Sequence, residues 1–260
     1  MKKSIDISAE VNFLICLMFL IWSMTLFSQE KNFEKITVQD GLSHSTVYNI
    51  DQDTNGFMWF GTREGLNKYD GKTIKTYYEE EGLSSNQINT IKSTSRGLLI
   101  GTYRGLDVFL PEYDRFEKLL SHQEIKGAVS SIFESENNEI LVGTTNGLFK
   151  IDKEGEVQHL IKNISVQEIE SFKTNVLWVA LNKRILLIND IGEKIREYQI
   201  PESPGKYQDG STYAINTIYK DSKNNLYVGT TRGLFYLNQE TEKFQYVNLT
   251  KKEEREAEVI

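Results

Sequence analysis

Apolar residues recur in short, regularly spaced pairs along most of the chain. The pairs are Val47/Ile50, Ile88/Ile91, Val129/Ile132, Val166/Ile169 and Ile215/Ile218. Two apolar residues three positions apart in a strand point to opposite faces, so a strand that carries such a pair is buried on both sides. The pattern therefore predicts five strands that are each sandwiched between neighbouring layers.

A Gly-centred motif follows each pair at nearly constant distance. The segment at residues 59–66 (WFGTREGL) recurs at 99–106, 141–148 and 227–234, and a degenerate copy at 178–185 has Ala180 and Arg184 in place of its two glycines. Counted from the first Gly or from Ala180, the copies lie 40, 42, 37 and 49 residues apart. A four-stranded propeller blade repeats at about 40 to 45 residues, so the chain is predicted to hold five such units.

Each unit also contains turn residues and a further amphipathic strand, and together these predict the fold class. We expect an all-β protein of β-propeller-type blades, each with four antiparallel strands, at residues 47–78, 88–120, 129–161, 166–200 and 215–249. Both glycines of the motif are interpreted as turn residues that need a positive φ, so the fourth unit should have an altered second hairpin. An extra strand at residues 33–38 is left over, which predicts an open or incomplete propeller.

The repeated motif resembles the two component regulator propeller repeats of sensor proteins from Bacteroidetes. The leading segment at residues 33–43 (FEKITVQDGLS) resembles the start of such sensor domains, and Gly82-Leu83-Ser84 repeats its Gly-Leu-Ser end. The resemblance implies an extracytoplasmic, glycan-sensing region of a hybrid two-component system. It also implies that the chain is an amino-terminal portion, with any kinase activity in segments outside this sequence.

The amino end is predicted to direct export. Residues 12–27 form an apolar run that follows Lys2 and Lys3, and its length suits a signal peptide better than a spanning helix. We assign residues 1–28 to a signal peptide, 29–250 to the blades and 251–260 to a frayed tail, and we expect a periplasmic or otherwise extracytoplasmic location. Asp6 and Glu10 weaken the basic start, so an uncleaved anchor stays an alternative.

Charge limits the classes of partner. Acidic residues outnumber basic ones 37 to 30, for a net charge of −7, and no basic cluster offsets them. Binding to a phosphate backbone needs a basic face, so we expect no nucleic-acid partner for this region. Membrane contact is expected only through the signal or anchor segment or through a carboxy-terminal part beyond this sequence. Further propeller blades or a homodimer partner are also candidates.

The sequence offers no catalytic motif. His44, His122 and His159 are isolated and lack the spacing of metal ligands. The segment at residues 51–56 (DQDTNG) is similar to the start of a calcium loop but lacks the closing Glu, so a hairpin turn is the better interpretation. We predict no enzyme activity, no metal site and no cofactor.

Candidate ligand contacts lie in turns and in one long loop. Loops on rigid scaffolds often carry function, and the loop at residues 201–213 joins two predicted blades. Aromatic faces and polar side chains suit an oligosaccharide. The candidates are Arg63, Tyr103, Arg104, Asn146, Tyr207, Gln208, Asp209, Tyr213 and Arg232. Two alternatives remain at this point: an exported propeller scaffold that binds proteins, and a glycan-active propeller enzyme.

Overall fold

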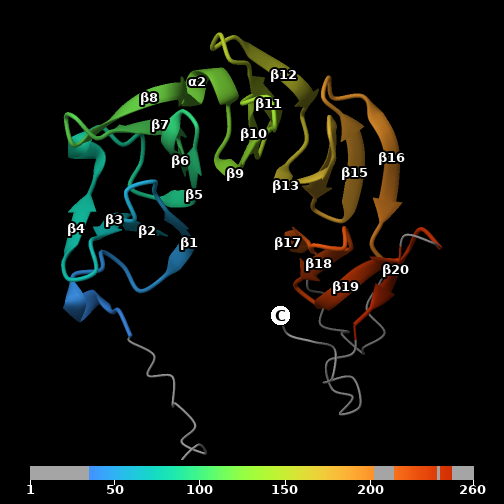
Figure 1. Cartoon of the computed structure of the whole chain (residues 1–260), viewed down its shortest axis with the longest axis horizontal. Coiled ribbons are helices and arrows are strands. Elements are labelled where there is room, and N and C mark those ends of the chain that lie inside the picture. Colours follow the sequence, from blue (N-terminus) through green and yellow to red (C-terminus); the bar gives the residue numbers. More distant parts are fainter. Residues whose placement is uncertain (1–34, 202–213, 239–240, 248–260) are drawn as a thin grey trace, which may run out of the picture. The chain divides into compact units, whose positions relative to one another are not determined.

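The computed structural model describes residues 35–201, 214–238 and 241–247, and these form five sheets of four consecutive antiparallel strands (Figure 1). The predictions of an all-β fold, of five blades and of four strands in each blade are confirmed. The first sheet contains β1 (Val47–Gln52), β2 (Met58–Thr62), β3 (Gly65–Tyr69) and β4 (Ile74–Tyr77). The predicted signal peptide and the tail at residues 251–260 lie outside the described residues.

The other four sheets follow the same order. The second contains β5 (Ile88–Thr94), β6 (Gly97–Thr102), β7 (Gly105–Leu110) and β8 (Arg115–Ser121). The third contains β9 (Val129–Glu134), β10 (Ile140–Thr144), β11 (Gly147–Ile151) and β12 (Val157–Lys162). The fourth contains β13 (Val166–Lys173), β14 (Val176–Leu181), β15 (Arg184–Asn189) and β16 (Lys194–Gln199). The fifth contains β17 (Ile215–Lys220), β18 (Leu226–Thr230), β19 (Gly233–Asn238) and β20 (Lys243–Tyr246).

Four apolar clusters lie between consecutive sheets and make up the core. Between the first and second sheets, for example, Trp59 and Tyr77 pack with Ile88 and Ile91, and all four side chains are buried. The first strands of neighbouring sheets also contact each other in chain order, β1 with β5 and so on to β17. Within the described residues no comparable contact joins β17 to β1, so the propeller is open.

The second residue of each apolar pair is buried as predicted, except at the amino end. Ile91, Ile132, Ile169 and Ile218 are between 3% and 7% exposed, as expected for strands covered on both sides. Ile50 is 53% exposed, so the prediction that its strand is buried on both sides is wrong. The physical reason is that no described sheet precedes β1.

The expected strand at residues 33–38 is also wrong where the structure describes it. Val38 begins the 3-10 helix η1 (Val38–Asp40), because Thr37 caps that helix and exchanges hydrogen bonds with Asp40. Gly41 then ends the helix with a φ of 107°, a conformation that glycine adopts at little cost. The same device recurs before the next sheet, as η2 (Glu79–Glu81) ended by Gly82. Residues 33 and 34 lie outside the described residues.

All five sheets belong to one compact unit, Thr37–Ile260. A short helix, α2 (His122–Ile125), is the third linker element and precedes β9. No helix in the described ranges is both long and apolar enough to cross a membrane.

Candidate functional site

In the first, second, third and fifth sheets, the turn between the second and third strands lies against the linker that precedes the same sheet. The backbone N–H of Arg63 donates to Thr46 O (3.2 Å), that of Tyr103 to Gln87 O (3.1 Å), and that of Thr145 to Ala128 O (3.0 Å). Turns and linkers therefore emerge together on one side of the propeller, which we call the linker face. This side carries the turn residues that the sequence analysis selected.

A threonine hydroxyl closes four of these turns. Thr102 Oγ1 donates to Gly105 O (3.0 Å) and accepts from the backbone N–H of Arg104 (3.1 Å). Thr62, Thr144 and Thr230 make the same two bonds. The fourth sheet has Leu181 at this position, which cannot form them. The residues at the tips of these turns therefore differ between sheets, while the hydrogen bonds that close the turns stay the same.

The two motif glycines have different roles, which corrects the sequence interpretation. The second one can be a turn residue, as at Gly65 with a φ of 128°, whereas Arg184 has no left-handed backbone. The first one is required by the next sheet instead. A Cβ built on Gly101 would lie 2.5 Å from Val129 Cγ1, and one on Gly143 would lie 2.7 Å from Val166 Cγ1. The glycine therefore makes room for the first strand of the following blade.

The Gly-Leu-Ser linkers are fixed by one polar residue on the third strand. Ser43 donates its N–H to Asn67 Oδ1 (2.8 Å), and Asn67 Nδ2 donates to Ser43 Oγ (2.8 Å). In the second sheet Ser84 donates its N–H to Asp107 Oδ2 (2.8 Å) and its hydroxyl to Asp107 Oδ1 (2.5 Å). Asn67 and Asp107 are fully buried, so each linker is hydrogen-bonded to a buried side chain of the third strand.

The pKa of the Asp107 carboxyl lies above its ordinary value. Burial raises the pKa of this carboxyl to about 6, although the Ser84 hydrogen bonds and the charge of Lys118 act in the opposite direction. A buried carboxylate loses hydration that its partners restore only in part. The carboxyl therefore changes its charge in a mildly acidic range, directly beneath the linker.

A polar cavity of about 450 Å³ opens above this linker. Arg104 and Glu79 approach each other across it, with Nη1 and Oε2 3.8 Å apart. The cavity combines charged, hydroxyl and amide side chains from a turn, two linkers and the end of β8. Its lining residues are Glu79, Leu83, Ser84, Arg104, Lys118, Ser121, His122 and Gln123.

The structure places the predicted site residues on separate blades. Arg104 lines the cavity, and Tyr103 lies beside it in the same turn with 54% of its surface exposed. Arg63, Asn146 and Arg232 occupy the equivalent turns of the first, third and fifth sheets. The loop candidates Tyr207, Gln208, Asp209 and Tyr213 lie outside the described residues.

Sequence reasoning missed Lys118, Ser121 and His122. It compared the second-to-third strand turns, while these residues come from the end of the fourth strand and from the next linker. Antiparallel order brings that end to the linker face as well, so strand direction was the signal that could have identified them.

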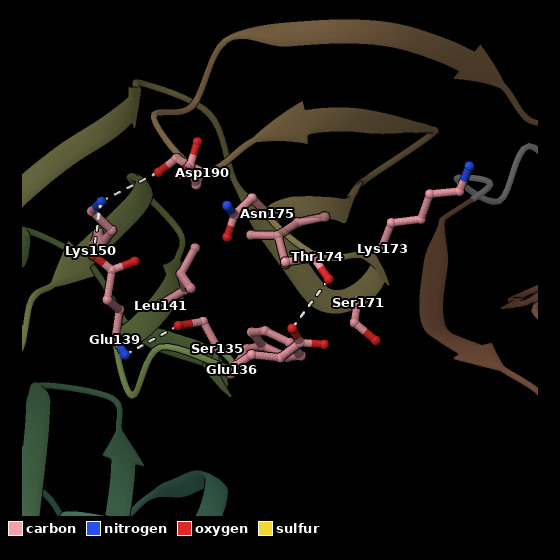
Figure 2. Close-up of a pocket in the computed structure, with 12 residues that line it drawn as sticks. Ser135, Glu136, Glu139, Leu141, Lys150, Ser171, Lys173, Thr174, Asn175 and Asp190 are labelled. Carbon is pink, nitrogen blue, oxygen red and sulfur yellow. Dashed lines mark hydrogen bonds and ion pairs between the residues drawn. The ribbon is translucent and has the colours of Figure 1, made fainter.

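A second, smaller cavity lies between the third and fourth sheets, among turns at the opposite strand ends (Figure 2). Lys150 is nearly buried there, and its Nζ lies 3.2 Å from Glu139 Oε1 and 3.4 Å from Asp190 O. Thr174 donates to Glu136 Oε2 at 3.2 Å. The cavity measures about 40 Å³, room for roughly one water molecule. These contacts join two blades and leave no space for a sugar.

The calcium-like segment is a hairpin turn in the structure. Asp53 Oδ1 accepts from the N–H groups of Asn55 (2.9 Å) and Phe57 (3.0 Å), and its Oδ2 accepts from Trp59 Nε1 (2.8 Å). Both carboxylate oxygens are thus engaged by the turn. Across residues 35–201, 214–238 and 241–247, no three His, Cys, Asp or Glu side chains gather as a metal site would require.

Two stretches of the chain match a family model described as "Two component regulator propeller", residues 41–64 and 209–232. A curated relative, histidine kinase P4 of Formosa agariphila, is 46% identical over 63 residues, which is 24% of this chain and 5% of the relative. Each of the two stretches that match the family model overlaps one copy of the Gly-centred motif.

Solved structures share the fold. The extracellular domain of a hybrid two component system from B. thetaiotaomicron is 25% identical, with a TM-score of 0.68 over 82% of this chain and 31% of that one. A virginiamycin B lyase from Staphylococcus aureus has a TM-score of 0.64 at 15% identity over 84% of this chain and 73% of the lyase, a likeness of fold alone. The chain thus spans less than a third of the first structure. The chain therefore carries two component regulator propeller repeats, which the family model matches at residues 41–64 and 209–232, among five copies of the motif and five sheets.

Proposed function

We propose that the five blades form a ligand-sensing propeller region of a two-component signalling protein, located outside the cytoplasm. In this proposal the linker face binds a carbohydrate, and the signal passes to kinase segments outside this sequence. The observation that carries it is the polar cavity on the linker face of a regulator propeller. The extracytoplasmic location is supported by the likeness to extracellular domains of such systems.

The chemistry of the cavity suits hydroxyl-rich ligands. Arg104 and Lys118 donate hydrogen bonds, Glu79 accepts them, and Ser121 and Gln123 can do both. A volume of about 450 Å³ lies within the range of roughly 300 to 1,000 Å³ that is typical of small-molecule sites. The exposed ring of Tyr103 beside the cavity offers an apolar face for stacking on a sugar ring.

The arrangement of the carboxylates at this site favours binding of a glycan over its hydrolysis. Asp107 uses both oxygens to hold Ser84, and Glu79 faces the guanidinium of Arg104. Glycosidases instead place two carboxyl groups on either side of the scissile bond. In the described part of the cavity the acidic groups act as fixed binding elements.

Calorimetric titration of the full chain with defined neutral, uronate-containing and sulfated oligosaccharides tests the proposal. We expect saturable binding to at least one class, and a loss of about tenfold or more in affinity for Arg104→Ala and for Tyr103→Ala, equivalent to about 1.4 kcal/mol or more. Lys72→Ala and Tyr113→Ala are matched controls, because these residues lie in the turns between the third and fourth strands of the first two sheets, at the strand ends opposite the linker face.

Two outcomes would overturn this function. The first is the absence of binding to every oligosaccharide class by a chain that keeps its strand-rich circular dichroism spectrum. The second is equal loss of affinity in the control variants, which would place the ligand away from the linker face. Shortening of the glycans during incubation would favour an enzyme instead.

A further inference from the structure

The serine of the Gly-Leu-Ser linker directs its hydroxyl proton differently in the first and second sheets. In the first sheet, Asn67 Nδ2 donates to Ser43 Oγ, which lies 2.8 Å from Thr62 Oγ1. Because Thr62 uses its one hydroxyl proton on Gly65 O, Ser43 is the donor to Thr62. The hydroxyl proton of this serine therefore points away from the third-strand residue.

In the second sheet Ser84 gives both of its protons to Asp107. Its N–H donates to Oδ2 (2.8 Å) and its hydroxyl to Oδ1 (2.5 Å). An ionised carboxylate only accepts hydrogen bonds, whereas the amide of Asn67 accepts one and donates another. Ser84 also lines the polar cavity on the linker face. While Asp107 is ionised, Ser84 thus has no proton to offer a ligand there.

Lys118 is coupled to the same carboxyl. It pairs with Asp107 across β7 and β8, and its positive charge favours the ionised form of Asp107. On the other side of β7, β6 places the apolar Ile100 opposite Asp107, and the linker contributes Ser84. Lys118 lines the cavity as well. The negative charge of Asp107 therefore offsets the positive charge that Lys118 brings to the cavity.

The other carboxylates around the cavity are engaged by neighbouring donors. Glu79 faces Arg104 and accepts a hydrogen bond from the N–H of Asn86 (3.3 Å). Glu124, in helix α2, accepts from the N–H (2.7 Å) and the hydroxyl (2.6 Å) of Ser121. These partners lie outside the pair formed by Asp107 and Ser84. A change of charge at Asp107 therefore acts on the cavity mainly through Ser84 and Lys118.

We propose that Asp107 determines which sugars this cavity binds, an inference that rests on the proposed function. When Asp107 is protonated, its O–H donates to Ser84 Oγ, as Asn67 donates to Ser43. The Ser84 hydroxyl and Lys118 then bind the carboxylate or sulfate of an acidic sugar.

The ionised form has the opposite effect on an acidic sugar. Ser84 and Lys118 both serve the carboxylate of Asp107, whose charge also repels an anionic ligand. Burial raises the pKa of Asp107 to about 6, so both forms are populated in mildly acidic solution. By linkage, an acidic sugar that favours the protonated form is bound together with a proton. A neutral sugar has no such preference between the two forms.

Calorimetric titration of the full chain at pH 5 and pH 7.5 tests this inference. The ligands are a uronate-containing, a sulfated and a neutral disaccharide. We expect both acidic ligands to bind about fivefold or more tightly at pH 5, since each unit by which binding raises the pKa contributes up to about tenfold. The neutral ligand should show no such change. At pH 6.5, heats measured in buffers of different ionisation enthalpy should show proton uptake with the acidic ligands alone.

Two variants assign the proton to a residue. Asp107→Asn should bind the acidic ligands at pH 7.5 about as tightly as the wild type does at pH 5, with no proton uptake. His122→Gln is the matched control, because His122 also lines the cavity and imidazoles change charge between about pH 5 and 8. This variant should keep the pH dependence. Circular dichroism before titration verifies that both variants are folded.

The outcomes distinguish this inference from the proposed function. Binding of acidic and neutral sugars with equal affinity at both pH values, without proton uptake by the wild type, would overturn the role of Asp107 and leave the sensing function standing. A pH dependence that persists in Asp107→Asn and disappears in His122→Gln would assign the proton to His122 instead. If none of the sugars binds at either pH, the proposed function itself fails.

Discussion

The fourth sheet and the other four sheets have the same strand order but reach it with different residues. In four turns a threonine hydroxyl binds the turn backbone, whereas the fourth turn has Leu181. The position that is Asn67 or Asp107 in the first two sheets is apolar in the other three, and in the fourth it is Leu186, buried among apolar residues. Ala180 replaces the first glycine and is itself fully buried beside Ile215.

The difference shows that the repeat motif combines separable functions. The threonine closes the turn, the first glycine leaves room for the next blade, and in the first two sheets the polar residue two positions after the second glycine binds the linker. The fourth sheet lacks all three features, and its pairing is still intact from Val176 opposite Asn189 to Ala180 opposite Ile185. Apolar packing on both sides is therefore sufficient to maintain the strand pairing of a blade, and the polar contacts fix its turn and its linker.

The largest expected effect compares the tryptophans of the fourth and first sheets. Trp178→Ala should lower the free energy of unfolding by about 3 to 5 kcal/mol, as for other buried aromatic truncations. Trp178→Phe should cost much less, because Trp178 Nε1 is buried without a hydrogen-bond partner among the described residues. Trp59→Phe should cost about 1 to 3 kcal/mol more than Trp178→Phe, since it breaks the 2.8 Å bond to Asp53. Urea unfolding measures both.

Equal costs for the two Trp→Phe variants would contradict the assignment of these environments. In that case the hydrogen bond to Asp53 would contribute nothing to the difference between the blades. Far-ultraviolet circular dichroism before unfolding controls for loss of the fold.

The second prediction concerns pH. The folded pKa of Asp107, about 6, lies above the unfolded value of 3.8, so the folded state binds the proton more tightly. The stability from this group is fully present below pH 3.8 and is lost as pH rises through about 6, by on the order of 3 kcal/mol. Asp107→Asn should remove this component, because Asn67 already makes the equivalent contacts in the first sheet.

Unfolding free energies at pH 4 and pH 7.5 provide the measurement. The fall between the two values should be smaller in Asp107→Asn than in the wild type, whatever the other carboxyl groups contribute. An unchanged fall would show that the carboxyl titrates in its ordinary range.

The smallest effect concerns the turn closure that the fourth sheet lacks. Thr102→Val should cost about 1 to 2 kcal/mol, because it removes two hydrogen bonds of a fully buried hydroxyl. Thr230→Val should cost less, since the bond from Thr230 to Gly233 is exposed to water. Thermal unfolding of the two variants tests this order, and a larger loss for Thr230→Val would reverse our interpretation.

Most of the fold could be predicted because its signals are local. The spacing of Ile88 and Ile91 and the turn residues of each unit depend on one strand or hairpin at a time. The predicted strand at residues 33–38 was wrong because Ile36 and Val38 alternate as in a strand, whereas Thr37 and Asp40 form a helix cap.

The site was less predictable, because its features depend on neighbours distant in sequence. The role of Gly101 becomes clear only when Val129 of the next blade is in place. Lys118 and His122 reach the cavity through the end of a fourth strand and through a linker, which comparison of equivalent turns does not reveal. Arg104 was found because it varies at a turn tip whose flanking residues are repeated.

The order of strands within each sheet has a consequence for how the protein folds. Every sheet is made from one contiguous stretch, as Ile88–Ser121 makes the second, so pairing partners lie close in sequence and loop closure is fast. The side chains of one finished sheet then offer hydrogen-bond acceptors to the first strand of the next, as Ser131 does to Ile169. Stability in such arrays is approximately a sum over nearest neighbours. We therefore expect the nascent chain to grow by sequential addition of sheets to a partly made propeller.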